Sequence, residues 1–130
     1  MPITALYAAL IALLFIVLSF RVIFVRGSEK ISLGDGGNKE LEKRIRAHAN
    51  CAEYAPFALI LIGLAESLHA GSFVLHALGG TPLLARTLHA VGISRTPQFV
   101  PARAGGMILT LGVIGAAAGL NLWLTLQIVK

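Results

Sequence analysis

The chain has 130 residues, of which 56% are hydrophobic and 13% are charged, and its mean hydropathy is +0.80. Soluble domains carry about 25% charged residues, so too few charges are present here to cover a water-facing globule. The formal net charge of +5 does not indicate nucleic-acid binding, because the basic residues gather between long apolar runs and are not interleaved with aromatics. A single cysteine excludes an internal disulfide framework. The composition therefore predicts a membrane protein.

Four apolar segments follow one another along the chain, at about 3–25, 47–68, 72–93 and 104–129. Each is close to the roughly 20 residues that a transmembrane helix needs. They predict an all-α bundle of four transmembrane helices in one domain, residues 1–130, with both chain ends on the same side. The first segment has no basic residue before it and no small-residue cleavage site after it, so we expect a permanent helix rather than a signal peptide.

The connections between the apolar segments differ in charge. The second connection has neither Lys nor Arg, the third contains Arg95 and Arg103, and the first contains six basic residues: Arg26, Lys30, Lys39, Lys43, Arg44 and Arg46. Since basic residues favour the cytoplasmic side, the first and third connections are expected in the cytoplasm and both termini outside.

The first connection contains the stretch GDGG, which is typical of a turn. Its three glycines suit positive φ angles; they are Gly34, Gly36 and Gly37. Asn38 is then expected to cap a helix that begins with Lys39 or Glu40. A phosphate-binding loop is disfavoured, because no Lys-Ser or Lys-Thr pair follows the glycines and no strand precedes them. The charged residues beyond the cap are expected to form a solvated helix face.

The fourth apolar segment is rich in small residues. Gly115 and Gly119 form a GxxxG pair, and Gly112 lies near the same face. Such faces let helix backbones approach closely in lipid. We therefore expect this face to pack tightly inside the bundle.

Polar residues at the start of the second segment share one helix face. Arg46, Asn50 and Glu53 are spaced by four and three residues, so their side chains project in the same direction. A carboxylate facing lipid at that depth would be strongly disfavoured, which predicts that this face looks into the protein or into a wet cavity. His48 points to nearly the opposite side, and geometry alone does not place it in this cluster.

The third segment adds Arg86 and His89, which again share a face. Guanidinium forks bind carboxylates in a bidentate manner, so the two helices together suit a small zwitterion with several carboxylates. The alternative is that Glu53 forms an ion pair with Arg46 or Arg86 that only holds the bundle together. No metal site is expected, because the histidines lack convergent carboxylate ligands.

The stretch RAHANCAEYAPF, residues 46–57, resembles the second-helix signature of the MAPEG family, the membrane-associated proteins in eicosanoid and glutathione metabolism. RTLH at residues 86–89 and RAGG at residues 103–106 support the resemblance, which covers essentially the whole chain. The glycine-containing first connection and the short loops are similar to the small bacterial branch. The resemblance implies a bacterial inner-membrane protein with periplasmic termini.

The resemblance also implies a homotrimer that binds glutathione as a co-substrate between subunits, near the cytoplasmic face. Arg103 would be the catalytic residue that stabilises the thiolate of glutathione. The tripeptide would contact Arg46, Asn50, Glu53, His48, Arg86 and His89. The first helix of a neighbouring subunit would add one arginine, for which Arg26 is preferred over Arg21.

The function that the resemblance implies is a glutathione-dependent transferase or peroxidase acting on small hydrophobic electrophiles or lipid peroxides. Enzymes of the family commonly carry a tyrosine about one turn beyond the third-helix histidine, where this chain has Ile93. The alternative is therefore a catalytically silent glutathione-binding or scaffold protein. A transporter subunit is disfavoured, because the polar residues do not continue through the membrane.

Overall fold

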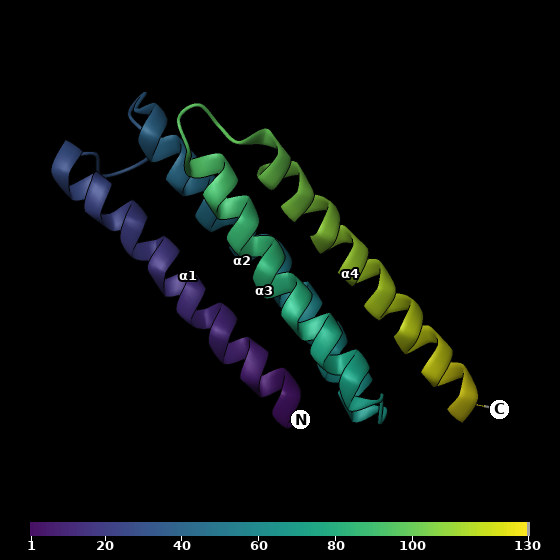
Figure 1. Cartoon of the computed structure of the whole chain (residues 1–130). Coiled ribbons are helices and arrows are strands. Elements are labelled where there is room, and N and C mark those ends of the chain that lie inside the picture. Colours follow the sequence, from purple (N-terminus) through teal and green to yellow (C-terminus); the bar gives the residue numbers. More distant parts are fainter. Residues whose placement is uncertain (130) are drawn as a thin grey trace.

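Four antiparallel helices make up the computed structural model, which describes residues 1–129 (Figure 1). In chain order they are α1 (Pro2–Glu29), α2 (Lys39–Ser67), α3 (Ser72–Ser94) and α4 (Val100–Ile128). Both termini lie at one end with the short α2–α3 connection, and we call this the terminal end. The connections at 30–38 and 95–99 lie at the other end, which we call the basic end. The predicted all-α fold is confirmed.

Helices α2 and α3 form the centre of the bundle, and α1 and α4 form its two edges (Figure 1). Both edge helices pack against both central helices, but α1 and α4 do not contact each other within residues 1–129. One apolar cluster joins α1, α2 and α3, and it contains Ile11, Leu18, Ala47, Cys51, Ala55, Ala90 and Ile93. A second joins α2, α3 and α4, and it contains Ile62, Ala65, Leu75, Leu78, Val113 and Ala117.

The two edge helices carry the most apolar surface. In the part of the chain that the structure describes, α1 and α4 are long and apolar enough to cross a membrane by themselves. Their large apolar side chains are mostly exposed, with Phe24 at 69% and Leu122 at 68%. A continuous apolar surface of this kind is typical of contact with lipid or with another chain. The central helices are less apolar because they carry the polar residues of the candidate site.

Helix α2 begins at Lys39, well before the apolar segment expected from 47, because the residues ahead of that segment have their own helix signals. The Asn38 side-chain oxygen accepts hydrogen bonds from the N–H groups of Glu40 and Leu41, both at 3.0 Å, so the predicted cap is confirmed. The predicted turn is confirmed too, with φ of 66° at Gly34, 58° at Gly36 and 77° at Gly37. Helix α2 thus extends beyond the apolar segment as a polar extension at the basic end.

The glycines of α4 do not pack as predicted. A Cβ at Gly112, Gly115 or Gly119 would meet no atom of the described chain within 4 Å, so the expectation that this face packs tightly inside the bundle is wrong. The glycine that does make a close contact is Gly106, where a Cβ would lie 2.5 Å from the Ala85 carbonyl oxygen. Helix α4 therefore touches α3 near the basic end and leaves its GxxxG face uncovered.

Candidate functional site

A pocket of about 760 Å³ opens at the basic end between α2, α3 and α4. It brings together four of the residues that the sequence singles out, Arg46, Asn50, His89 and Arg103. The rest of its lining consists of Lys39, Glu42, Lys43, Ile93, Gln98, Ala104, Met107 and Ile108. This pocket is the candidate functional site.

The lining is strongly cationic. Besides Arg46 and Arg103 it includes Lys39 and Lys43, and only Glu42 brings a negative charge. The sequence predicts only a solvated helix face for these two lysines and Glu42, whereas the structure places all three at the pocket. Once α2 starts at Lys39, the spacing of 39, 43, 46 and 50 places these side chains on one stripe of the helix. The pocket is therefore suited to a ligand that carries more than one negative charge.

His89 is 6% exposed and its ring lines the pocket. Its Nδ1 lies 3.0 Å from the Arg103 carbonyl oxygen, and a carbonyl oxygen can only accept, so Nδ1 carries the hydrogen. In the neutral ring Nε2 is then an acceptor, and it has no partner among residues 1–129. This nitrogen is itself buried, so His89 has one unpartnered polar atom enclosed behind the pocket surface.

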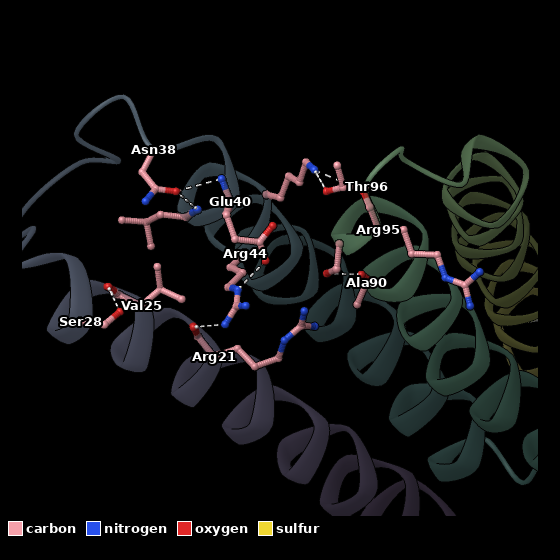
Figure 2. A network of polar contacts seen from close by, with 12 residues as sticks. Arg21, Val25, Ser28, Asn38, Glu40, Arg44, Ala90, Arg95 and Thr96 are labelled. Carbon is pink, nitrogen blue, oxygen red and sulfur yellow. Dashed lines mark hydrogen bonds and ion pairs between the residues drawn. The ribbon is translucent and has the colours of Figure 1, made fainter.

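Arg103 is held by the α3–α4 connection. Its Nη1 donates to the Gln98 side-chain oxygen at 2.6 Å. Lys43 Nζ in turn donates to the Arg95 carbonyl oxygen at 3.2 Å and to the Thr96 hydroxyl at 2.6 Å, which ties the connection to α2 (Figure 2). No feature of the sequence identifies Gln98, because it lies in an irregular segment whose path depends on tertiary contacts.

Arg86 lies behind the pocket instead of lining it. Its side chain is 2% exposed, and Nη1 donates to the Asn50 carbonyl oxygen at 3.4 Å. Nη2 donates to the Gly106 carbonyl oxygen at 3.0 Å and to the Thr110 hydroxyl. The guanidinium also lies 5.5 Å from the centre of the Tyr54 ring. Arg86 therefore joins α2, α3 and α4 through neutral groups.

Glu53 does not line the pocket and is exposed on the surface of the single chain. Within the described residues its carboxylate makes no hydrogen bond, and the ion pair present is between Arg44 and Glu40 at 2.9 Å. The alternative that Glu53 pairs with Arg46 or Arg86 is therefore wrong for the single chain. The physical reason is that Glu53 lies on the open side of α2, whereas Arg86 is enclosed between helices.

His48 faces α1 from the other side of α2, and Arg26 lies on α1 itself. The His48 ring packs on Phe15 at 4.4 Å between centres, and its Nε2 is 3.1 Å from the Ser19 hydroxyl. This confirms that His48 points away from the Arg46 stripe. Arg26 lies at the end of α1, where its Nη1 donates to the Ile31 carbonyl oxygen at 3.5 Å. Neither residue lines the pocket of its own chain.

Arg21 lies near the same end of α1. Its carbonyl oxygen accepts a hydrogen bond from Arg44 at 3.3 Å, and Arg44 also pairs with Glu40 (Figure 2). These contacts join α1 to the polar extension of α2. Arg21 thus takes part in holding the basic end together through its backbone.

Comparison with known proteins agrees with the residue pattern. The MAPEG family model matches residues 4–123. The chain belongs to the MAPEG family. It is similar to the inner membrane protein YecN of Escherichia coli strain K12 and to the protein of the same name in Escherichia coli O6:H1, each 35% identical over 121 residues, which are 93% of this chain and 91% of the relative.

The family resemblance predicted from the sequence is thereby confirmed. This MAPEG protein is an integral membrane protein, and its four helices form an all-α membrane bundle. The exposed apolar surfaces of α1 and α4 are accounted for by that environment.

Proposed function

We propose that this MAPEG protein binds glutathione in the pocket at the basic end and transfers its thiolate to a small hydrophobic electrophile. The observation that carries the proposal is the convergence of Arg46, Asn50, His89 and Arg103 on one pocket. Glutathione has two carboxylates and one ammonium group. The excess of cations in the lining suits its carboxylates, and Glu42 supplies a partner for its ammonium group.

In the proposed reaction the Arg103 guanidinium favours the ionised thiol, and the released proton passes to water. The thiolate sulfur attacks an electrophilic carbon. With chlorodinitrobenzene, a C–S bond forms while the C–Cl bond breaks, and chloride leaves with the bonding electrons. With a lipid peroxide, two glutathione molecules are oxidised to the disulfide while the peroxide is reduced to an alcohol and water.

The proposal includes a homotrimer in which neighbouring subunits complete the site. One support is the open face of α2, where Phe57 (65% exposed), Ile60 (61%) and Leu64 (51%) follow Glu53. An exposed carboxylate at this depth requires a polar partner from a ligand or another chain. His48 and Arg26, which face away from the pocket of their own chain, are the residues proposed to reach the site of a neighbour. The apolar substrate would enter from the bilayer.

Arg86 takes a different part in this proposal. Because it is enclosed behind Asn50, it acts by fixing the backbone of α2 and by adding positive charge near the pocket.

We place the protein in a bacterial inner membrane with the basic end in the cytoplasm. The name of the Escherichia coli relatives supports the inner membrane. The concentration of Lys and Arg at the basic end supports the orientation.

The test is glutathione-dependent turnover of chlorodinitrobenzene by purified protein. Arg103→Ala should lower kcat about 100-fold, as removal of one stabilising donor does in other enzymes. Arg95→Ala is the matched control, since Arg95 is an arginine at the same end of the bundle, at the start of the α3–α4 connection, and its side chain does not line the pocket. No turnover by the wild-type protein, or full turnover by Arg103→Ala, would contradict the proposal.

The second candidate is a silent glutathione-binding protein, and Ile93 favours it. Ile93 lines the pocket where the family enzymes commonly have a tyrosine. Neither tyrosine of the chain lines the pocket. The Tyr54 ring lies against Arg86, and the Tyr7 hydroxyl is 3.1 Å from Nδ1 of His76. Calorimetry separates the candidates: binding of glutathione without turnover supports the silent protein.

A further inference from the structure

The backbone of Arg103 is fixed by contacts with α3. A Cβ on Gly92 would lie 2.5 Å from the Arg103 nitrogen, so the end of α3 and the start of α4 touch directly. His89 Nδ1 donates to the Arg103 carbonyl oxygen at 3.0 Å. The Phe99 N–H donates to the Gly92 carbonyl oxygen at 3.0 Å, which holds the connection against α3. Only the long side chain of Arg103 is left free to change direction.

Gln98 restrains that side chain. Its Oε1 accepts the hydrogen bond from Arg103 Nη1 at 2.6 Å, and both residues line the pocket. In the described residues no carboxylate forms an ion pair with Arg103. A guanidinium has five N–H donors, so one bond to Gln98 leaves the others for a ligand. Because the amide is neutral, the guanidinium also keeps its whole positive charge.

We propose that Gln98 is a positioning residue, which holds the Arg103 guanidinium at the pocket through a neutral acceptor so that its full charge acts on the thiolate of bound glutathione. This inference rests on the proposed function. Two substitutions separate orientation from charge. Gln98→Glu keeps an acceptor at the same place but cancels the charge of Arg103, whereas Gln98→Leu keeps the charge and removes the restraint.

The experiment uses the purified full-length protein in detergent. The ultraviolet absorption of thiolate is measured against pH with saturating glutathione, and kcat and KM are measured with chlorodinitrobenzene. S-methylglutathione, which lacks an ionisable thiol, reports by calorimetry whether peptide binding is intact. Gln127→Glu is the matched control, because it makes the same chemical change about 36 Å along α4 from Arg103 at 1.5 Å per residue.

For Gln98→Glu we expect the thiol pKa of bound glutathione to rise, with a roughly tenfold smaller thiolate fraction below that pKa. The pH–rate profile should move to higher pH by the same amount. Gln98→Leu should lower kcat and move the profile to higher pH by less than Gln98→Glu does, because an unrestrained guanidinium keeps its charge but stabilises the thiolate less. Both variants should bind S-methylglutathione as the wild type does, and Gln127→Glu should change nothing.

The outcomes distinguish this inference from the function on which it rests. If wild-type protein shows a bound thiolate and turnover, but Gln98→Glu has the same pH profile, the role of Gln98 is overturned and the proposed function stands. If both Gln98 variants instead lose S-methylglutathione binding without a change of profile, Gln98 has a purely structural or binding role. If the wild type forms no bound thiolate, the proposed function fails, and the inference fails with it.

Discussion

Arg86 on α3 and Thr110 on α4 are hydrogen-bonded at the centre of the bundle, where they are 2% and 1% exposed. The same guanidinium donates to the carbonyl oxygens of Asn50 and Gly106, so neutral oxygens from two helices hold this cation. A buried donor that loses its partner costs about 1–3 kcal/mol. The Thr110 hydroxyl and the Gly106 carbonyl together therefore tie α4 to this cation.

Thr110→Val, which keeps the shape and removes the hydroxyl, should destabilise the protein by about 1–3 kcal/mol. Thr110→Ser should retain most of the stability. The measurement is thermal unfolding in detergent, followed by circular dichroism. Thr125→Val is the control, because Thr125 is exposed on the same helix. Equal unfolding temperatures for Thr110→Val and Thr125→Val would show that the Arg86–Thr110 bond does not stabilise the bundle.

The two glycine positions on α4 should respond differently to alanine. Gly106→Ala would bring a Cβ within 2.5 Å of the Ala85 carbonyl oxygen and 2.8 Å of the backbone nitrogen of His89. Since overpacking costs about 1–3 kcal/mol, we expect a lower unfolding temperature and a displaced His89. Gly112→Ala meets no atom of the described chain and should leave the stability of the monomer unchanged. A neutral Gly106→Ala would contradict the close contact.

These glycines also show what the sequence could and could not predict. A GxxxG pattern indicates a face where close approach is allowed, but it does not say which helix approaches, or whether that helix belongs to the same chain. Gly106 belongs to no such pattern and makes the close contact, whereas Gly115 and Gly119 form the pattern, and a Cβ on either would meet no atom of residues 1–129 within 4 Å. Helix order followed from hydropathy, while helix contacts depended on tertiary packing.

The candidate site was predictable to a similar extent. Helical spacing correctly grouped Arg46 with Asn50 and separated His48 from them. It placed Arg86 with the site, although that side chain turns inward to carbonyl groups of α2 and α4 that no sequence pattern identifies. The lysines at 39 and 43 were missed because the polar extension of α2 has no apolar signal.

Glu66 should stabilise the terminal end as a cap supplied by another helix. Its oxygens accept hydrogen bonds from the Ile3 N–H at 3.0 Å, the Thr4 N–H at 2.7 Å and the Thr4 hydroxyl at 2.6 Å. Met1, the residue before α1, supplies no side-chain cap. Glu66→Ala should therefore lower the unfolding temperature, because the first N–H groups of α1 lose their cap.

Thermal unfolding in detergent measures this effect as well. Glu29→Ala serves as the control, since Glu29 is an exposed carboxylate at the opposite end of α1. Glu66→Gln should fall between the wild type and Glu66→Ala, because an amide keeps one acceptor and loses the charge that favours a helix N-terminus. If Glu66→Ala and Glu29→Ala unfold alike, the cap does not contribute.

Glu53 should matter for glutathione binding without affecting the fold of the chain. Its carboxylate forms no hydrogen bond or ion pair among the described residues, so Glu53→Gln should leave the unfolding temperature unchanged. The dissociation constant for glutathione should rise about tenfold, which corresponds to 1.4 kcal/mol. Isothermal calorimetry provides the measurement. Glu40→Gln is the comparison, because it removes only the ion pair with Arg44; equal affinities in the two variants would exclude Glu53 from the site.

Ile93 offers a gain-of-function test of the proposed chemistry. It lines the pocket one turn beyond His89 and is 8% exposed. A larger side chain at this position can therefore extend into the pocket. A phenol there would donate a hydrogen bond to the thiolate and stabilise its charge, as a neutral donor does in other anion sites. Ile93→Tyr should therefore raise kcat for chlorodinitrobenzene about tenfold over Ile93→Phe, which has the same ring without the hydroxyl. Because the comparison is between two aromatic variants, any loss of packing around Ala90 and Ala47 affects both equally. Equal rates for the two variants, with intact glutathione binding, would show that Ile93 is not what limits thiolate formation in this pocket.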